Sequence, residues 1–147
     1  MDIADPRKAE VMASFPYLGP SDFEIRSLPD RNYNCIAYAA GQDKQWWWPT
    51  MFWPKKCARV ETIDAFVETF GTIGYKICED TCLEEGYEKV ALYASNQRPK
   101  HAARQLENGN WVSKLGVSYD IEHNSLDSLS GRVYGSVVCV LKRPRIS

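Results

Sequence analysis

The apolar residues in the first half of the chain recur with a helical period. Ile63, Phe66, Val67 and Phe70 stand at positions i, i+3, i+4 and i+7 of one segment. On a helix these positions form a single stripe. The spacing therefore predicts an amphipathic helix over residues 61–70 that buries this stripe against a core.

Two further helices are predicted nearer the N-terminus. Asp5-Pro6 supplies an N-cap residue followed by a proline that fits a first helical turn, which predicts a short helix through Met12. A stretch rich in proline and glycine then predicts a loop. The next helix is expected to begin at Cys35 and to continue to about Lys44, and its alanines would allow close packing against a sheet.

The second half of the chain changes to a strand period. Strand-forming runs lie at residues 75–78, 89–94, 100–107, 110–116 and 135–141. Within the last run, residues 137–141 are continuously apolar, which is typical of a central strand covered on both faces. Helices followed by a mostly antiparallel sheet predict an α+β fold, and 147 residues predict a single domain over residues 1–147.

Composition and charge narrow the class of protein. The formal net charge of −1 gives no electrostatic basis for binding nucleic acid or an anionic membrane. The sequence has no apolar run of membrane-spanning length, and its N-terminus lacks the apolar region of a signal peptide. Five scattered cysteines are typical of free thiols in a reducing compartment. We therefore expect a cytoplasmic protein without a cofactor.

Cys35 and His101 are the candidate catalytic pair. Cys35 follows a polar loop and opens a helix, where unpaired backbone N–H groups and the helix dipole favour a thiolate. His101 begins a later predicted strand, from which its side chain could reach a cleft. A nucleophilic thiol followed by a histidine base is the arrangement of a cysteine hydrolase. Each residue taken alone has a plain structural interpretation, as a buried thiol and a surface imidazole.

A third residue that would orient the histidine is less clearly indicated. Asn108-Gly109 is a strong hairpin signal, and with these two residues as the turn, His101 is expected opposite Gly116. Ser113 and Asp120 are then the nearest polar candidates along the chain. The amides of Asn34 and Asn32 are candidate oxyanion donors beside Cys35.

His123 is the rival base. It lies in an acidic, polar context that predicts a solvated surface turn. The pair Cys78-x-x-x-Cys82 has a wider spacing than the usual zinc knuckle, and Cys57 and His123 would have to complete four ligands. We therefore expect no metal site.

A cluster of tryptophans follows the Cys35 helix. Trp46, Trp47, Trp48 and Trp53 fall within eight positions. Pro49 lies among them and Pro54 follows directly, which excludes a regular helix. Large aromatic side chains usually serve a core, so one interpretation is a loop packed over the domain. In the other, Trp47, Trp48 and Trp53 line one wall of a substrate cleft.

These motifs resemble those of the papain-like cysteine hydrolases, in particular the compact NlpC-type bacterial peptidases. Asn-Cys-Ile-Ala-Tyr-Ala at residues 34–39 is similar to the family's cysteine at the head of a helix. His-Ala-Ala-Arg-Gln-Leu at residues 101–106 is similar to its histidine strand, and residues 108–113 are similar to the hairpin that brings in a third polar residue. The chain also resembles small uncharacterised bacterial proteins that share the first two elements.

The resemblance implies a papain-like core in which Cys35 is the nucleophile and His101 the base. Ser113 falls where the family has His, Asn, Gln or an acid, so either Asp120 substitutes for it or the dyad works alone. The expected activity is hydrolysis or transfer of an amide, peptide or related acyl bond, with a peptide or protein as substrate. The alternative is a catalytically inactive papain-like module that binds a protein partner through its Trp-rich loop.

Overall fold

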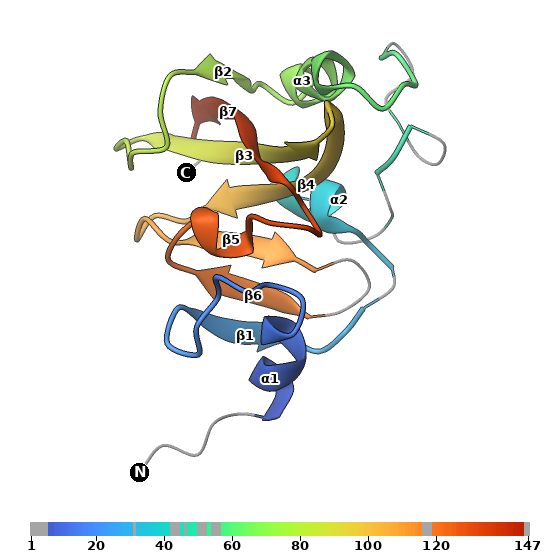
Figure 1. The fold of residues 1–147 in the computed structure, drawn as a ribbon. Coiled ribbons are helices and arrows are strands. Elements are labelled where there is room, and N and C mark those ends of the chain that lie inside the picture. Colours follow the sequence, from blue (N-terminus) through green and yellow to red (C-terminus); the bar gives the residue numbers. More distant parts are fainter. Residues whose placement is uncertain are drawn as a thin grey trace.

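The computed structural model describes residues 6–30, 32–41, 45, 47–49, 53, 57–115 and 119–145. The elements in chain order are α1 (Pro6–Met12), β1 (Phe23–Ser27), α2 (Cys35–Ala39), α3 (Ile63–Gly71), β2 (Lys76–Cys78), β3 (Tyr87–Ser95), β4 (Arg98–Gln105), β5 (Trp111–Lys114), β6 (Asp120–His123), the 3-10 turn η1 (Asp127–Leu129) and β7 (Ser136–Pro144). Helices beside an antiparallel sheet confirm the predicted α+β class (Figure 1).

All seven strands form one sheet in the order β1-β6-β5-β4-β3-β7-β2. Every neighbouring pair is antiparallel. Strands β3 to β6 follow one another as a meander, and β7 returns along the other side of β3. Strands β1 and β6 were not predicted, because the sequence places prolines and glycines around β1 and an acidic, polar run at β6.

The helices follow local signals in the sequence. Thr62 caps α3, since its Oγ1 accepts from the backbone N–H of Ala65 at 3.2 Å, and the predicted stripe is buried through Phe66 and Phe70. The predicted extension of α2 to Lys44 is wrong, because the helix ends at Ala39. Gly41 follows with φ of 89°, a left-handed conformation that stops a helix.

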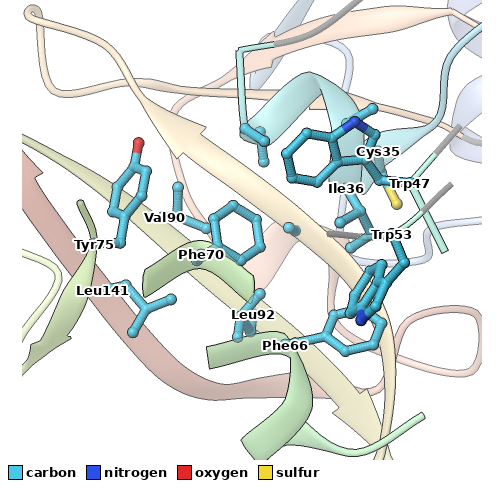
Figure 2. Packing of buried hydrophobic residues seen from close by; sticks show 14 of the residues in the cluster. Cys35, Ile36, Trp47, Trp53, Phe66, Phe70, Tyr75, Val90, Leu92 and Leu141 are labelled. Atoms are coloured by element: carbon cyan, nitrogen blue, oxygen red, sulfur yellow. The ribbon is translucent and has the colours of Figure 1, made fainter. Parts of the chain in front are cut away.

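The two faces of the sheet carry separate cores. The first, which we call the cysteine face, packs against α2 and α3 (Figure 2). Its members include Cys35, Ile36, Trp47, Trp53, Phe66, Phe70, Val90, Leu92, Ala102 and Leu141. The second, the histidine face, is covered by α1 and by the segment from η1 to β7. Its core includes Val11, Phe15, Tyr93, Ala103, Trp111, Ile121, Leu129 and Tyr134.

The hairpin between β4 and β5 has a register one residue different from the predicted one. Gln105 pairs with Trp111, and the turn has Gly109 in the left-handed conformation with φ of 93°, closed by a bond from Leu106 N to Asn110 O of 2.7 Å. This is the turn with a bulged glycine rather than the two-residue turn. A shift of one residue moves a side chain to the opposite face of a sheet. Gly116, which the predicted register set opposite His101, lies outside the described residues.

Strand β7 also departs from the prediction of a fully covered central strand. Of its residues, Leu141 is the one that is fully buried, and Val138 is 53% exposed. The register shifts against β3 between Leu92 and Tyr93. The outer neighbour of β7 is the three-residue strand β2, which covers little of it.

Candidate functional site

Cys35 is the first residue of α2 and lies on the cysteine face. Asn34 is its N-cap, with an extended backbone and a side-chain Oδ1 that accepts from Ala37 N at 3.1 Å. The backbone N–H groups of Ala102, Ile36 and Cys35 itself surround the sulfur and favour a thiolate, but burial outweighs them and raises the thiol pKa to about 11. The resting sulfur therefore carries its proton at neutral pH.

The Asn34 side chain is fully engaged in holding the chain together. Its Oδ1 also accepts from Trp47 N at 3.0 Å, and its Nδ2 donates to Trp47 O at 2.9 Å. The amide therefore ties the tryptophan segment to the start of α2, and the Nδ2 group expected as an oxyanion donor donates to Trp47 O. Asn32 is exposed, and its backbone N–H donates to Asp30 Oδ1 at 2.8 Å.

His101 lies on the histidine face, opposite Cys35. Its ring stacks on Tyr134 with centroids 4.0 Å apart and planes 5° apart, and it also contacts Tyr93. Neither ring nitrogen has a hydrogen-bond partner within the described part of the chain. Burial, with a smaller effect of His123, holds the pKa of His101 well below its usual value. Hence no thiol–imidazole hydrogen bond joins the predicted dyad in this structure.

The alternation of side chains along β4 explains this separation. Ala102 packs in the cysteine-face core. Its neighbours His101 and Ala103 point to the other face, because successive side chains of a strand alternate. The backbone of one strand therefore lies between the thiol and the imidazole.

Ser113 and His123 form a closed pair on the histidine face. Ser113 Oγ lies 2.8 Å from His123 Nε2, and His123 Nδ1 lies 2.9 Å from Ser125 O. The carbonyl only accepts, so Nδ1 carries a proton and Ser113 donates to Nε2. Burial lowers the pKa of His123 to about 4. The predicted surface turn is thus wrong, and Ser113 orients His123 instead of His101.

Lys114 is a charged group near Cys35, and it pairs with Asp120 across β5 and β6. Lys114 is fully buried, with Nζ 5.1 Å from the ring centre of Tyr33. Burial lowers the pKa of Lys114, while the charges of Asp30, Asp120 and Cys35 oppose that shift. Asp120 accepts from Ser27 Oγ at 2.7 Å and from Tyr33 Oη at 3.3 Å. Asp120 therefore lies with Tyr33 and Lys114 on the cysteine face, and not beside His101.

The sequence-based interpretation missed Lys114. A lysine on a predicted strand looks like a solvated residue, and the assumed hairpin register placed it on the face of Ala103 and His101. In the observed register, Lys114 is on the face of Cys35. The bulged-glycine turn at Gly109 was the signal that could have placed it correctly.

Two of the three tryptophans expected at a cleft wall belong to the core. Trp47 and Trp53 are buried, and the Trp53 Nε1 donates to Ala58 O at 2.9 Å. Trp53 packs against Phe66 with ring centroids 5.0 Å apart (Figure 2). Trp48 is partly buried and meets Phe66 edge-on at 5.3 Å. The segment therefore packs over the core at these positions, while Trp46 lies outside the described residues.

Three further findings concern ligands and surroundings. Within the described ranges, no group of three or more His, Cys, Asp or Glu side chains is arranged to hold a metal ion. All five cysteines are free. No helix in the described part of the chain is long and apolar enough to cross a bilayer.

Comparison with known proteins gives a family match over most of the chain. The family described as "Domain of unknown function (DUF7689)" matches residues 24–142, which include α2 and every strand residue from Glu24 to Lys142. No curated protein and no solved structure matches the chain.

Proposed function

Since the chain belongs to the DUF7689 family, whose description assigns no activity, we propose its function from the site itself. We propose a papain-like thiol hydrolase that cleaves or transfers an amide or related acyl bond through Cys35. In this proposal Lys114, and not His101, is the base. Asp120 is the positioning residue that steadies Lys114.

The arrangement of elements supports a papain-like core. Helix α2 begins at the cysteine and contacts β4 and β5. These two strands belong to the consecutive meander β3 to β6. A nucleophile at a helix start, held against an antiparallel meander, is the arrangement that the NlpC-type resemblance implies. The resemblance supports the proposed fold. The choice of base rests separately on the residues around Cys35.

One observation carries the choice of base: the buried side chain of Lys114 lies on the face of Cys35 and interacts electrostatically with it. Burial favours the neutral thiol and the neutral amine alike. Pairs of titratable groups shifted in this way are typical of acid–base partners. A buried lysine with a lowered pKa is a known form of general base.

The chemistry then follows in balanced steps. The Lys114 amine accepts the thiol proton, and the thiolate attacks the carbonyl carbon of the substrate. Backbone N–H groups of Cys35 and Ala102, which already surround the sulfur, are placed to stabilise the oxyanion. The Lys114 ammonium returns its proton to the leaving amine. Water then attacks the thioester, which releases the acid and restores the thiol.

The class of substrate follows from the bond that this chemistry can break. Peptides, peptidoglycan stem peptides and glutamine side-chain amides all present an amide carbonyl to a thiolate. A peptide or protein partner and a cytoplasmic setting remain predictions of the sequence.

The test is covalent acylation of Cys35 by p-nitrophenyl acetate. We expect a burst of p-nitrophenol and an acetyl group on Cys35 in the peptide map. Lys114→Met is expected to slow acylation about 100-fold or more, whereas His101→Phe and the surface control Lys142→Met leave it unchanged. If His101→Phe abolishes acylation while Lys114→Met does not, the choice of base is wrong.

A second candidate is the catalytically inactive module. The observation that favours it is the burial of Cys35. The residue is 7% exposed, and burial raises its thiol pKa to about 11. This candidate expects no acylation of Cys35 in the wild-type protein. It also expects Cys35→Ser to retain partner binding and Trp48→Ala to lose it, because Trp48 is the described tryptophan with the more exposed ring in the Trp-rich loop.

A further inference from the structure

Two free cysteines lie four residues apart in one loop, at the sheet edge formed by β2. Cys78 ends β2 and is partly exposed, and Cys82 follows four residues later and is exposed. Both residues bond to Asp80. Cys78 Sγ lies 3.5 Å from Asp80 O, and Cys82 N donates to Asp80 Oδ1 at 3.1 Å. Asp80 therefore contacts both cysteines within one short loop.

The turn between them is firmly held. Lys89 Nζ, on a side chain that is 2% exposed, donates to Asp80 O at 3.1 Å and to Asp80 Oδ1 at 2.9 Å. Gln105 Nε2 donates to Thr81 O at 3.1 Å. The cysteine pair is thus presented by a turn that is fixed to β3 and β4.

This pair lacks the ligands of a metal site. The described residues offer no third His, Cys, Asp or Glu arranged with the two thiols to hold a metal. Cys57, which the sequence suggested as a further ligand, is buried in the cysteine-face core, and His123 is bound within the histidine face. The chemistry left to two neighbouring accessible thiols is their own oxidation.

We propose that Cys78 and Cys82 form a reversible disulfide when the protein meets a peroxide. The thiolate of the more exposed Cys82 attacks one peroxide oxygen, the O–O bond breaks, and a sulfenic acid and water result. Cys78 then attacks the sulfenic sulfur, which forms the S–S bond and releases a second water. Two thiols are oxidised and one peroxide is reduced. A dithiol reductant reverses the step by thiol–disulfide exchange.

A disulfide needs Cα atoms about 4.4 to 6.8 Å apart. The bonds of Cys78 Sγ and Cys82 N to Asp80 hold both cysteines to one short loop, and the proposal requires this loop to bring the two thiols within that range. This modification site is independent of the function proposed for Cys35, because the turn lies at the far edge strand of the sheet.

The experiment treats the full chain with hydrogen peroxide and maps peptides by mass spectrometry. We expect one disulfide between Cys78 and Cys82, lost on reduction and absent from Cys78→Ser and Cys82→Ser. In Cys78→Ser, dimedone is expected to trap a sulfenic acid on Cys82. Asp80→Ala is expected to slow disulfide formation severalfold without slowing dimedone labelling, because it loosens the turn and leaves the thiols in place.

Three results would overturn the proposal. One is oxidation of Cys82 to higher acids in the wild-type protein with no Cys78–Cys82 bond. Another is pairing of Cys78 with Cys139, its electrostatic neighbour on β7. The third is a disulfide found only between two chains. Acylation of Cys35 is measured separately, so failure here leaves the proposed function standing, and the reverse also holds.

Discussion

The two faces of the sheet carry the same kinds of residue and use them differently. On the histidine face, Ser113 and His123 bond to each other and to a backbone carbonyl, and His101 lies closed under Tyr134. On the cysteine face, Cys35 lies near Lys114, which pairs with Asp120 on the next strand. One strand backbone separates the two sets. The chemistry open to a side chain therefore depends more on the face of the sheet on which it lies than on its position in the sequence.

The largest expected effect concerns the core of the cysteine face. Trp53→Ala should lower the free energy of unfolding by about 3 to 5 kcal/mol, because it removes a buried indole that packs on Phe66. The matched variant Trp48→Ala should lower it by about 1 to 2 kcal/mol, since that ring is partly exposed. Urea denaturation measures both. Equal small losses would show that Trp53 does not belong to the core.

The next effect concerns the turn that covers the histidine face. Gly135 has φ of 75°, and a Cβ there would overlap the carbonyl of Ala94. Gly135→Ala should therefore lower the unfolding free energy by about 3 kcal/mol, from left-handed strain plus overlap. The matched control is Gly86→Ala, with φ of 83° and open space, which should lose about 1 kcal/mol. Similar losses in both variants would contradict the close approach at Gly135.

Acid should destabilise the histidine face specifically. His101 and His123 have pKa values lowered by burial in the folded chain, so both are neutral in either state above about pH 6.5. As the pH falls, the unfolded chain binds protons that the folded chain does not. His123, with a folded pKa of about 4, should remove about 3 kcal/mol of stability between about pH 6.5 and pH 4.

The variant His101→Phe isolates the contribution of His101 to this loss of stability in acid. His101→Phe keeps an aromatic ring on Tyr134 and removes two unpartnered nitrogens, so we expect unchanged or higher stability at pH 7. As the pH falls below about 6.5, the unfolding free energy of the variant should fall less steeply than that of the wild type. The difference between the two slopes should be about 1.4 kcal/mol per pH unit. A curve parallel to that of the wild type would show that His101 already titrates normally in the folded chain.

The smallest expected effect separates the two faces directly. Ser113→Ala should lower stability by about 1 to 2 kcal/mol, because the buried His123 Nε2 loses its donor. It should leave the alkylation rate of Cys35 unchanged, since Ser113 lies on the other face. A change in the reactivity of Cys35 would mean that the two faces are coupled.

Periodicity in the sequence predicted the elements with strong local signals. The stripe of α3, the capped start of α2 and the strands β3 to β5 follow from side-chain spacing and turn residues. Strand β1 was hidden among prolines and glycines, and β6 by its acidic residues, although Ile121 and His123 both point to one core. These strands depend on long-range pairing with each other, which local patterns do not contain.

The partners of Cys35 in the candidate site could not be predicted from the sequence for a related reason. Cys35 was placed correctly at a helix start, but its partner depended on which face each strand residue occupies. One residue of register at the β4–β5 turn moved Lys114 to the face of Cys35, and Ser113 to that of His101. Burial also decides the protonation state of Cys35. A helix start favours the thiolate, but burial raises the thiol pKa to about 11.

The most direct measurement is the pH dependence of Cys35 alkylation by iodoacetamide, followed residue by residue in the peptide map. We expect the rate to rise about tenfold per unit from about pH 6 to pH 9.5 without a plateau, as a thiol with a pKa of about 11 requires. His101→Phe should leave the profile unchanged, and Lys114→Met should slow the reaction throughout, because the Lys114 charge lowers the thiol pKa. A plateau near neutral pH that disappears in His101→Phe would contradict the separation of thiol and imidazole by the sheet.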